Sequence, residues 1–107
     1  MTEAEYIALA DRAFARILSA FDHVDAEQAD VESAGDVITI TFGNGRRVVV
    51  NTQRPAKQIW LAGGQRAWHF GWDEPSARWT DAKGSGAELF ETLRTIARET
   101  GALALEL

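Results

Sequence analysis

Carboxylates in the N-terminal third are the residues of this sequence whose number and spacing best suit chemistry. The group consists of Asp11, Asp22, Asp25, Glu27, Asp30 and Glu32. Carboxylate oxygens without thiolate or imidazole partners suit hard cations, held in weak, flexible and water-rich coordination. The plainer interpretation is a solvated helix face followed by an edge strand that charge protects against aggregation. We expect these residues to run as a ridge down one flank of a helix, through a connection and onto a strand.

A second candidate surface combines an indole ring with amides. If the aliphatic residues of two neighbouring strands face the core, period-two alternation sends the residues between them to the opposite face of the sheet. The residues predicted to face outward together are Asn51, Gln53, Gln58, Trp60 and His69. An exposed Trp among amides on a rigid sheet has the composition of a protein-binding hot spot. The alternative is that Trp60 covers a neighbouring strand or lies at a sheet edge.

Signals for an enzyme are weak. The chain has two His and no Cys, and it contains no His pair at metal-ligand spacing, no nucleophile elbow and no phosphate-binding loop. We interpret His23, which lies in the acidic connection between the predicted N-terminal helix and the first predicted strand, as a surface residue. Four Trp residues are compatible with base stacking on single-stranded nucleic acid, but that function needs a basic groove, which the overall charge opposes. We therefore expect a binding protein rather than an enzyme.

Charge is distributed unevenly along the chain. Residues 1–36 carry nine carboxylates against Arg12 and Arg16, a net charge of −7, whereas the remainder carries +2, which gives the total of −5. At 100° per residue, Asp11 and Asp22 fall on one flank of the predicted helix and the two arginines on the other. This polarity disfavours nucleic acid and anionic lipid, and it favours cations or a basic protein surface.

Length and composition predict one domain that spans residues 1–107. Apolar residues make up 46% of the 107 residues and charged residues 25%, which is typical of a globular domain that folds without disulfides or a structural metal. The absence of Cys excludes zinc ribbons, thiol catalysis and iron-sulfur ligation by thiolates, and it is compatible with the cytoplasm as the expected compartment. No segment has the pattern of a membrane span or of a secretory signal.

Hydrophobic periodicity predicts the elements that position these residues. Apolar spacings of three and four predict a helix from Thr2 to about Phe21, opened by a capping box of Thr2 and Glu5. Alternating segments predict strands at 29–33, 37–42, 46–52, 58–62, 67–72 and 78–81.

A second helix is predicted near the C-terminal end of the sequence. A capping box of Ser85 and Glu88 is expected to open it, and Gly101 is expected to end it. The alternating leucines of residues 103–107 are expected to pack on the core. The predicted fold class is α+β: a two-layer sandwich with two helices on one face of a five- to six-stranded, mainly antiparallel sheet, whose other face is open.

The segment Asn51-Thr52-Gln53-Arg54-Pro55-Ala56-Lys57-Gln58-Ile59-Trp60-Leu61-Ala62, followed by His69-Phe70, closely resembles the signature of the frataxin family. The bacterial, CyaY-type branch fits best. The likeness covers essentially the whole chain, from the acidic N-terminal helix and the Thr39-Ile40-Thr41-Phe42 strand to the Trp79 strand and the C-terminal helix.

The resemblance implies a small iron-binding protein of iron-sulfur cluster assembly. Such a protein contacts the cysteine desulfurase and the scaffold protein as iron donor, regulator or both. The family's acidic ridge, which binds Fe²⁺ or Fe³⁺ weakly and docks on a basic patch of the desulfurase, maps to the six carboxylates named above. The family's sheet face maps to Asn51, Gln53, Gln58 and Trp60, and a monomer that multivalent cations can bridge into oligomers is expected.

One departure from the family pattern lies near the end of the first helix. Many members have a carboxylate pair there, whereas this chain has Leu18 and Ser19. Fewer or weaker iron sites are therefore expected on the helix, and the prediction shifts towards Asp22, Asp25, Asp30 and Glu32. Two alternatives stay open: ferroxidase or iron-storage activity, and a metal-independent binding module that uses the Trp60 face.

Overall fold

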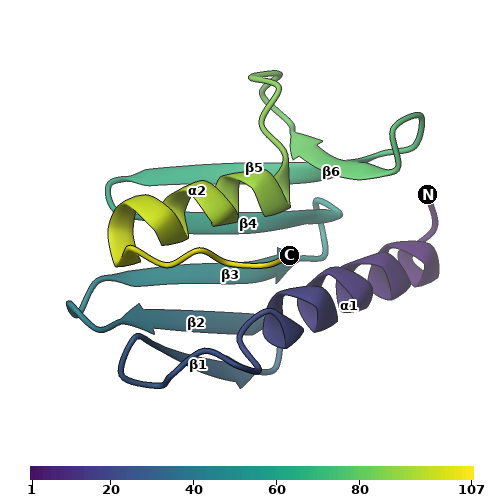
Figure 1. Ribbon diagram of the computed structural model, residues 1–107. Coiled ribbons are helices and arrows are strands. Elements are labelled where there is room, and N and C mark those ends of the chain that lie inside the picture. The colour runs from purple at the N-terminus through teal and green to yellow at the C-terminus, as the bar shows by residue number, and fades with distance from the viewer.

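The N-terminal helix begins where the capping box predicted. A computed structural model describes all of residues 1–107 and places α1 at Glu3–Ser19 (Figure 1). The backbone N–H of Glu5 donates to Thr2 Oγ1 at 3.1 Å, and the backbone N–H of Thr2 donates to Glu5 Oε1 at 3.0 Å. These two bonds satisfy donors that a helix N-terminus otherwise leaves unpaired. The buried stripe of α1 consists of Tyr6, Ala10, Ala13 and Ile17.

Six strands follow α1 as one antiparallel meander. They are β1 (Ala29–Ala34), β2 (Val37–Phe42), β3 (Arg47–Gln53), β4 (Gln58–Gly63), β5 (Arg66–Asp73) and β6 (Arg78–Asp81). Each strand pairs with its sequence neighbour, so the sheet order is β1-β2-β3-β4-β5-β6 and β1 is an edge strand. The predicted strand bounds agree with these to within one residue at each end.

The second helix, α2 (Leu89–Gly101), begins differently from the prediction. The Ser85 and Glu88 capping box does not form: Glu88 itself is the N-cap, and its carboxylate accepts hydrogen bonds from the backbone N–H groups of Phe90 and Glu91 at 3.0 Å each. Ser85 Oγ instead accepts from Ala87 N at 3.2 Å. Ala87 and Glu88 pair back with the end of β6, through the Asp81 N–H to Ala87 O bond and a Thr80–Glu88 bridge, so the chain is free to coil only after Glu88.

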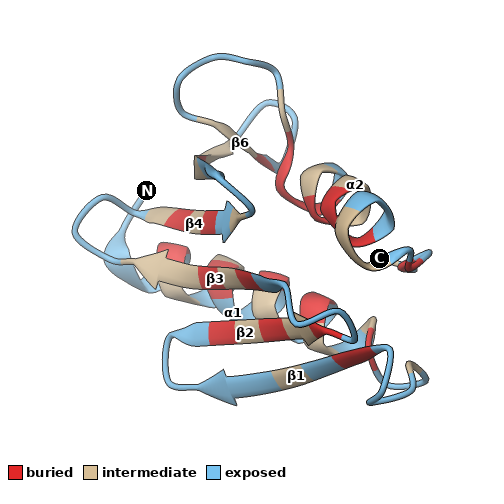
Figure 2. Cartoon of the chain, turned by 90° about the vertical axis from the view of Figure 1, so that its left-hand side faces the viewer, coloured by how far each residue is buried: buried red, intermediate tan, exposed pale blue.

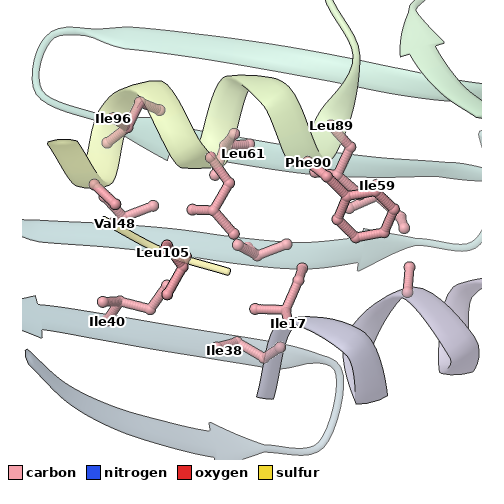
Figure 3. Close-up of a cluster of buried hydrophobic side chains, with 14 of the residues drawn as sticks. Ile17, Ile38, Ile40, Val48, Ile59, Leu61, Leu89, Phe90, Ile96 and Leu105 are labelled. Atoms are coloured by element: carbon pink, nitrogen blue, oxygen red, sulfur yellow. The ribbon is translucent and has the colours of Figure 1, made fainter. Parts of the chain in front are cut away.

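Both helices and the C-terminal segment cover the same face of the sheet (Figure 1). Buried and less buried residues alternate along β2 and β3 in Figure 2, because only one face of each strand meets the helices. The core of 22 buried apolar residues draws on every layer, including Ile17 of α1, Ile40 of β2 and Leu89 of α2 (Figure 3). The predicted two-layer α+β architecture is confirmed.

The C-terminal segment packs on the core as expected. Leu103 and Leu105 are 6% and 5% exposed, so they complete the apolar layer beside α2. Gly101 ends α2, and a Cβ at that position would lie 2.2 Å from the Phe42 ring, so glycine is required for this close approach. Neither α1 nor α2 combines the length and the apolar character that a membrane-spanning helix requires.

Candidate functional site

The open face of the sheet aligns three of the predicted partner-binding residues in one row. Asn51 of β3 is paired with Trp60 of β4, and Trp60 is paired with His69 of β5. Directly paired residues of antiparallel strands point to the same face. Their neighbours Val50, Leu61 and Phe70 are fully buried beneath the helices, so the row itself lies on the uncovered side.

Trp60 contacts two side chains of this face. Its ring stacks on the imidazole of His69, with centroids 4.0 Å apart and an interplanar angle of 10°. Its Nε1–H donates to Gln58 Oε1 at 2.9 Å. The sequence left two interpretations of Trp60 open, an exposed indole or one that covers a neighbouring strand; the residue is half-buried and its ring lies against His69 of β5, which agrees with the second. The indole is therefore held in one orientation by two partners.

The two glutamines form the next row of the same face. Gln53 of β3 is paired with Gln58 of β4, two positions along from the Asn51–Trp60 pair. All four are half-buried, and Asn51 Nδ2 donates to the backbone carbonyl of Thr52 at 3.2 Å. We call Asn51, Gln53, Gln58, Trp60 and His69 the Trp60 patch. The structure brings all five predicted residues together.

Tyr6 supports the Trp60 patch from the helix side, a role that no sequence pattern indicated. Its hydroxyl donates to the backbone carbonyl of Gln58 at 2.7 Å, and its ring meets Trp79 edge-on with centroids 6.1 Å apart. Burial raises the pKa of Tyr6 above its ordinary value. Gln58 thus receives a hydrogen bond from α1 through its backbone and one from Trp60 through its side chain.

The six predicted carboxylates are all exposed but occupy three different places. Asp11 lies on α1, beside Asp36 and Arg54. Asp22, Asp25 and Glu27 lie in the connection after α1, where the backbone N–H of Glu27 donates to Asp25 Oδ1 at 3.0 Å. None of the six forms an ion pair, because the two pairs in the molecule join Arg54 to Asp36 at 3.8 Å and Arg94 to Glu91.

Asp30 and Glu32 share the open face with the Trp60 patch. Asp30 is paired with Thr41 of β2, and Glu32 is paired with Thr39. Ala29, the residue before Asp30 in β1, is buried on the helix-covered face, so Asp30 points to the opposite, open face. Thr39 is in turn paired with Val49 of β3, and Val49 points to the same face as Asn51, which lies two residues later in the same strand. The sequence predicted two separate surfaces, but part of the acidic set lies at the edge of the same surface as Trp60. No three His, Cys, Asp or Glu side chains lie close enough together to hold one metal ion.

The acidic connection is held in place by the β2–β3 turn. The backbone N–H of Gly43 donates to Gln28 O at 2.9 Å, and a Cβ on Gly43 would lie 2.5 Å from Glu27 O. Asp25 O accepts from the backbone N–H groups of Gln28 and Ala29 at 2.9 and 3.1 Å. The predicted strands at 37–42 and 46–52 implied a turn between them, but no sequence pattern indicated that this turn positions carboxylates.

Comparison with known proteins gives one consistent family. A model of the frataxin-like domain matches residues 1–102. The iron-sulfur cluster assembly protein CyaY of Delftia acidovorans is 33% identical over 109 residues, covering 99% of this chain and 96% of its own. A frataxin of Psychromonas ingrahamii superposes with a TM-score of 0.87 at 24% identity over 99% of this chain and 97% of its own. Trimeric frataxin from Saccharomyces cerevisiae, complexed with ferrous iron, superposes with a TM-score of 0.75 at 23% identity over 89% and 87%.

Proposed function

Since the chain belongs to the frataxin family, we propose that it is an iron-binding protein of iron-sulfur cluster assembly. In this proposal it acts as iron donor, as regulator of the cysteine desulfurase–scaffold complex, or as both. The name of the Delftia relative and the ferrous complex of the yeast neighbour support the biological setting. The observation that carries the proposal is the run of exposed, unpaired carboxylates from Asp22 to Glu32, next to the open sheet face.

Iron is captured at the surface in this proposal. Asp22, Asp25, Asp30 and Glu32 offer hard oxygen ligands, and each is free of competing ion pairs. Because they are not gathered into a cage, one or two carboxylates hold an ion and water completes its coordination. Asp11 and Glu27 contribute to the local negative potential. Such sites release iron readily, which suits a protein that hands the metal to a partner.

The negative charge of these carboxylates also favours binding to the cysteine desulfurase. The unpaired carboxylates create a negative field that attracts a basic surface of the desulfurase and orients the encounter. Asp30 and Glu32 lie at the edge of the open face, so a partner bound there also reaches the Trp60 patch. The scaffold protein then contacts the indole and the amides, whose fixed orientation reduces the entropy lost on binding.

The test separates metal capture from docking. The variant Asp22→Asn/Asp25→Asn/Asp30→Asn/Glu32→Gln is compared with Glu3→Gln/Glu74→Gln/Glu99→Gln/Glu106→Gln, which removes the same charge from other exposed positions. Anaerobic titration with Fe²⁺ is followed by paramagnetic broadening of backbone amide signals, and desulfurase affinity is measured by calorimetry. We expect the first variant to lose iron-dependent broadening at residues 22–32 and to bind desulfurase more weakly, whereas the control keeps both. Unchanged values in the first variant would remove the carboxylates from the mechanism.

The Trp60 patch supports a second candidate function, a binding module that needs no metal. The indole is stacked and hydrogen-bonded by side chains of the protein itself, which requires no metal ligand. If scaffold protein binds equally well with and without Fe²⁺, and Trp60→Ala abolishes that binding, the metal-independent function is favoured. Ferroxidase activity would instead appear as oxygen-dependent Fe²⁺ oxidation above the rate in buffer.

A further inference from the structure

A groove on the helix side of the molecule has a charge opposite to that of the whole chain. It has a volume of about 410 Å³ and lies between one flank of α1, the β5–β6 hairpin and the first turns of α2. Four arginines line it, namely Arg12, Arg16, Arg78 and Arg94. The Trp60 patch and the carboxylates Asp30 and Glu32 lie on the other face of the sheet, so the proposed function does not use this groove.

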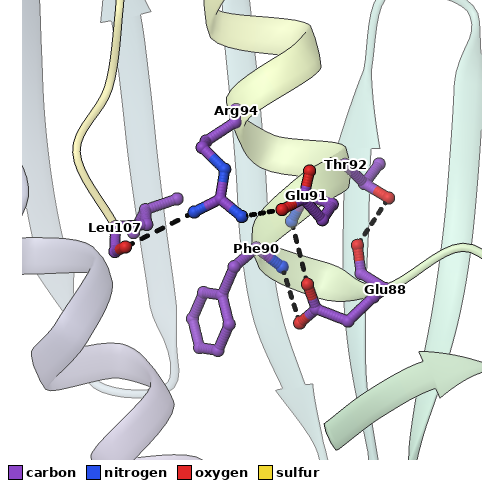
Figure 4. Close-up of polar contacts among 6 residues, drawn as sticks. All are labelled: Glu88, Phe90, Glu91, Thr92, Arg94 and Leu107. Carbon is purple, nitrogen blue, oxygen red and sulfur yellow. Dashed lines mark hydrogen bonds and ion pairs between the residues drawn. The ribbon is translucent and has the colours of Figure 1, made fainter.

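Most of the positive charge in the groove is not neutralised by the protein. Arg94 pairs with Glu91 and donates to the backbone carbonyl of Leu107 at 3.4 Å (Figure 4). Glu88 is committed to the backbone N–H groups of Phe90 and Glu91. Arg12, Arg16 and Arg78 have no carboxylate within ion-pair distance, so three guanidinium groups remain available.

The floor of the groove is aromatic. Trp72, Trp79 and Phe90 contribute to it, and Trp72 meets Trp79 edge-on with centroids 5.4 Å apart. The guanidinium carbon of Arg16 lies 4.0 Å from the centroid of the Phe90 ring, which positions this cation directly over an apolar surface. A cationic rim above an aromatic floor complements a molecule with an anionic head and a flat apolar body.

We propose that this groove binds a small organic anion, with an oxyanion head between Arg12, Arg16 and Arg78 and a planar apolar body against Trp72. Carboxylate and phosphate share the relevant chemistry, because guanidinium groups pair with the oxygens of both in a bidentate manner. The volume lies within the range of about 300 to 1,000 Å³ that is typical of small-molecule sites. The net charge of −5 repels anions from the rest of the surface, so binding depends on this local arrangement.

The experiment titrates the full chain with three probes of similar shape and different head: benzoate, phenyl phosphate and the neutral benzyl alcohol. Binding is followed by amide chemical shifts and by the indole signals of Trp72 and Trp79. The variant Arg12→Gln/Arg78→Gln is compared with Arg46→Gln/Arg98→Gln, which removes the same charge from exposed positions outside the groove. Thermal unfolding confirms that both variants fold.

We expect the two anions to shift signals around the groove and benzyl alcohol to have no such effect. The Arg12→Gln/Arg78→Gln variant should bind the anions about tenfold or more weakly, and the control variant should match the wild type. The tighter of the two anions identifies the head group, and binding should weaken at high salt. Equal binding of benzyl alcohol, or equal binding by both variants, would overturn the proposal. An acidic peptide of Glu and Phe that binds more tightly than either anion, with shifts beyond the groove, would overturn it in favour of a protein-docking surface.

Discussion

The Trp60 indole and the His69 imidazole lie nearly parallel at 4.0 Å between centroids, although they are nine positions apart in sequence. The contact exists because β4 and β5 pair with Trp60 directly opposite His69 on the open face. Each ring removes one side of the other from water, and Gln58 Oε1 restrains the indole by accepting a hydrogen bond from its Nε1–H. A partner therefore meets the indole already oriented.

Removal of the imidazole should release the indole. In His69→Ala, the loss of the stacked pair is expected to lower the free energy of unfolding by about 0.5 to 1.5 kcal/mol. The Trp60 Nε1 proton should exchange faster with solvent, and scaffold protein should bind more weakly because the free indole must be ordered on binding. Urea unfolding and hydrogen exchange measure the two effects. His23→Ala, an exposed position in the connection, is the control and should change neither.

The sequence was sufficient to predict the strand bounds and the orientation of each strand, because alternation is a local signal that burial on one face produces directly. It predicted Asn51, Trp60 and His69 on one face for the same reason. That Trp60 covers a neighbouring strand was left as one alternative, and its stack on His69 was not predicted, since the stack depends on register between strands, which alternation determines only to within two residues. The start of α2 was misplaced because Ala87 and Glu88 pair back with Asp81 and Thr80 of β6, a contact that a capping pattern does not reveal.

The positions of the carboxylates also depended on contacts between segments that a local pattern does not reveal. Their common sign and nearness in sequence predicted a ridge, but the sheet separates Asp30 and Glu32 from Asp11 on α1. The anchoring of the connection by Gly43 and the support of Gln58 by Tyr6 join residues 15 and 52 positions apart in sequence. No pattern within one segment contains either contact.

The Tyr6 hydroxyl couples α1 to the Trp60 patch. Tyr6→Phe should lower the free energy of unfolding by about 0.5 to 1.5 kcal/mol, because the Gln58 carbonyl loses its donor while the edge-on contact with Trp79 is retained. The amide signals of Gln58 and Trp60 should shift. Retention of wild-type stability and of both signals would contradict the coupling.

The same substitution tests the raised pKa of Tyr6. A phenol whose pKa is higher in the folded protein than in the unfolded chain destabilises the fold as pH rises above the ordinary value of about 10, because the unfolded state then loses its proton first. The wild type should therefore lose stability more steeply than Tyr6→Phe in that alkaline range. Urea unfolding across the range measures the difference.

Gly43 is expected to control the position of the acidic connection. A methyl group there would lie 2.5 Å from Glu27 O, so Gly43→Ala must displace the connection or the turn, at a cost of about 1 to 3 kcal/mol. The backbone signals of residues 25–29 should shift, and Fe²⁺-dependent broadening in the connection should change with them. Gly71→Ala is the control, because a Cβ at Gly71 meets no atom within 4 Å.

The capping box of α1 predicts that the protein loses stability in acid. The substitution Glu5→Gln tests the part of this loss that comes from the Glu5 carboxylate. The hydrogen bond from the Thr2 backbone N–H, aided by the Thr2 side chain, lowers the pKa of Glu5 below its ordinary value. A carboxyl whose pKa is lower in the folded state stabilises the fold above its unfolded pKa, and this contribution is lost as pH falls through the folded value. Glu5→Gln keeps an acceptor oxygen but does not titrate, so the wild type should be the more stable protein at neutral pH and the two should converge in acid. Urea unfolding of both proteins from neutral to acid pH measures the convergence, and a constant difference across that range would show that Glu5 does not act through its charge.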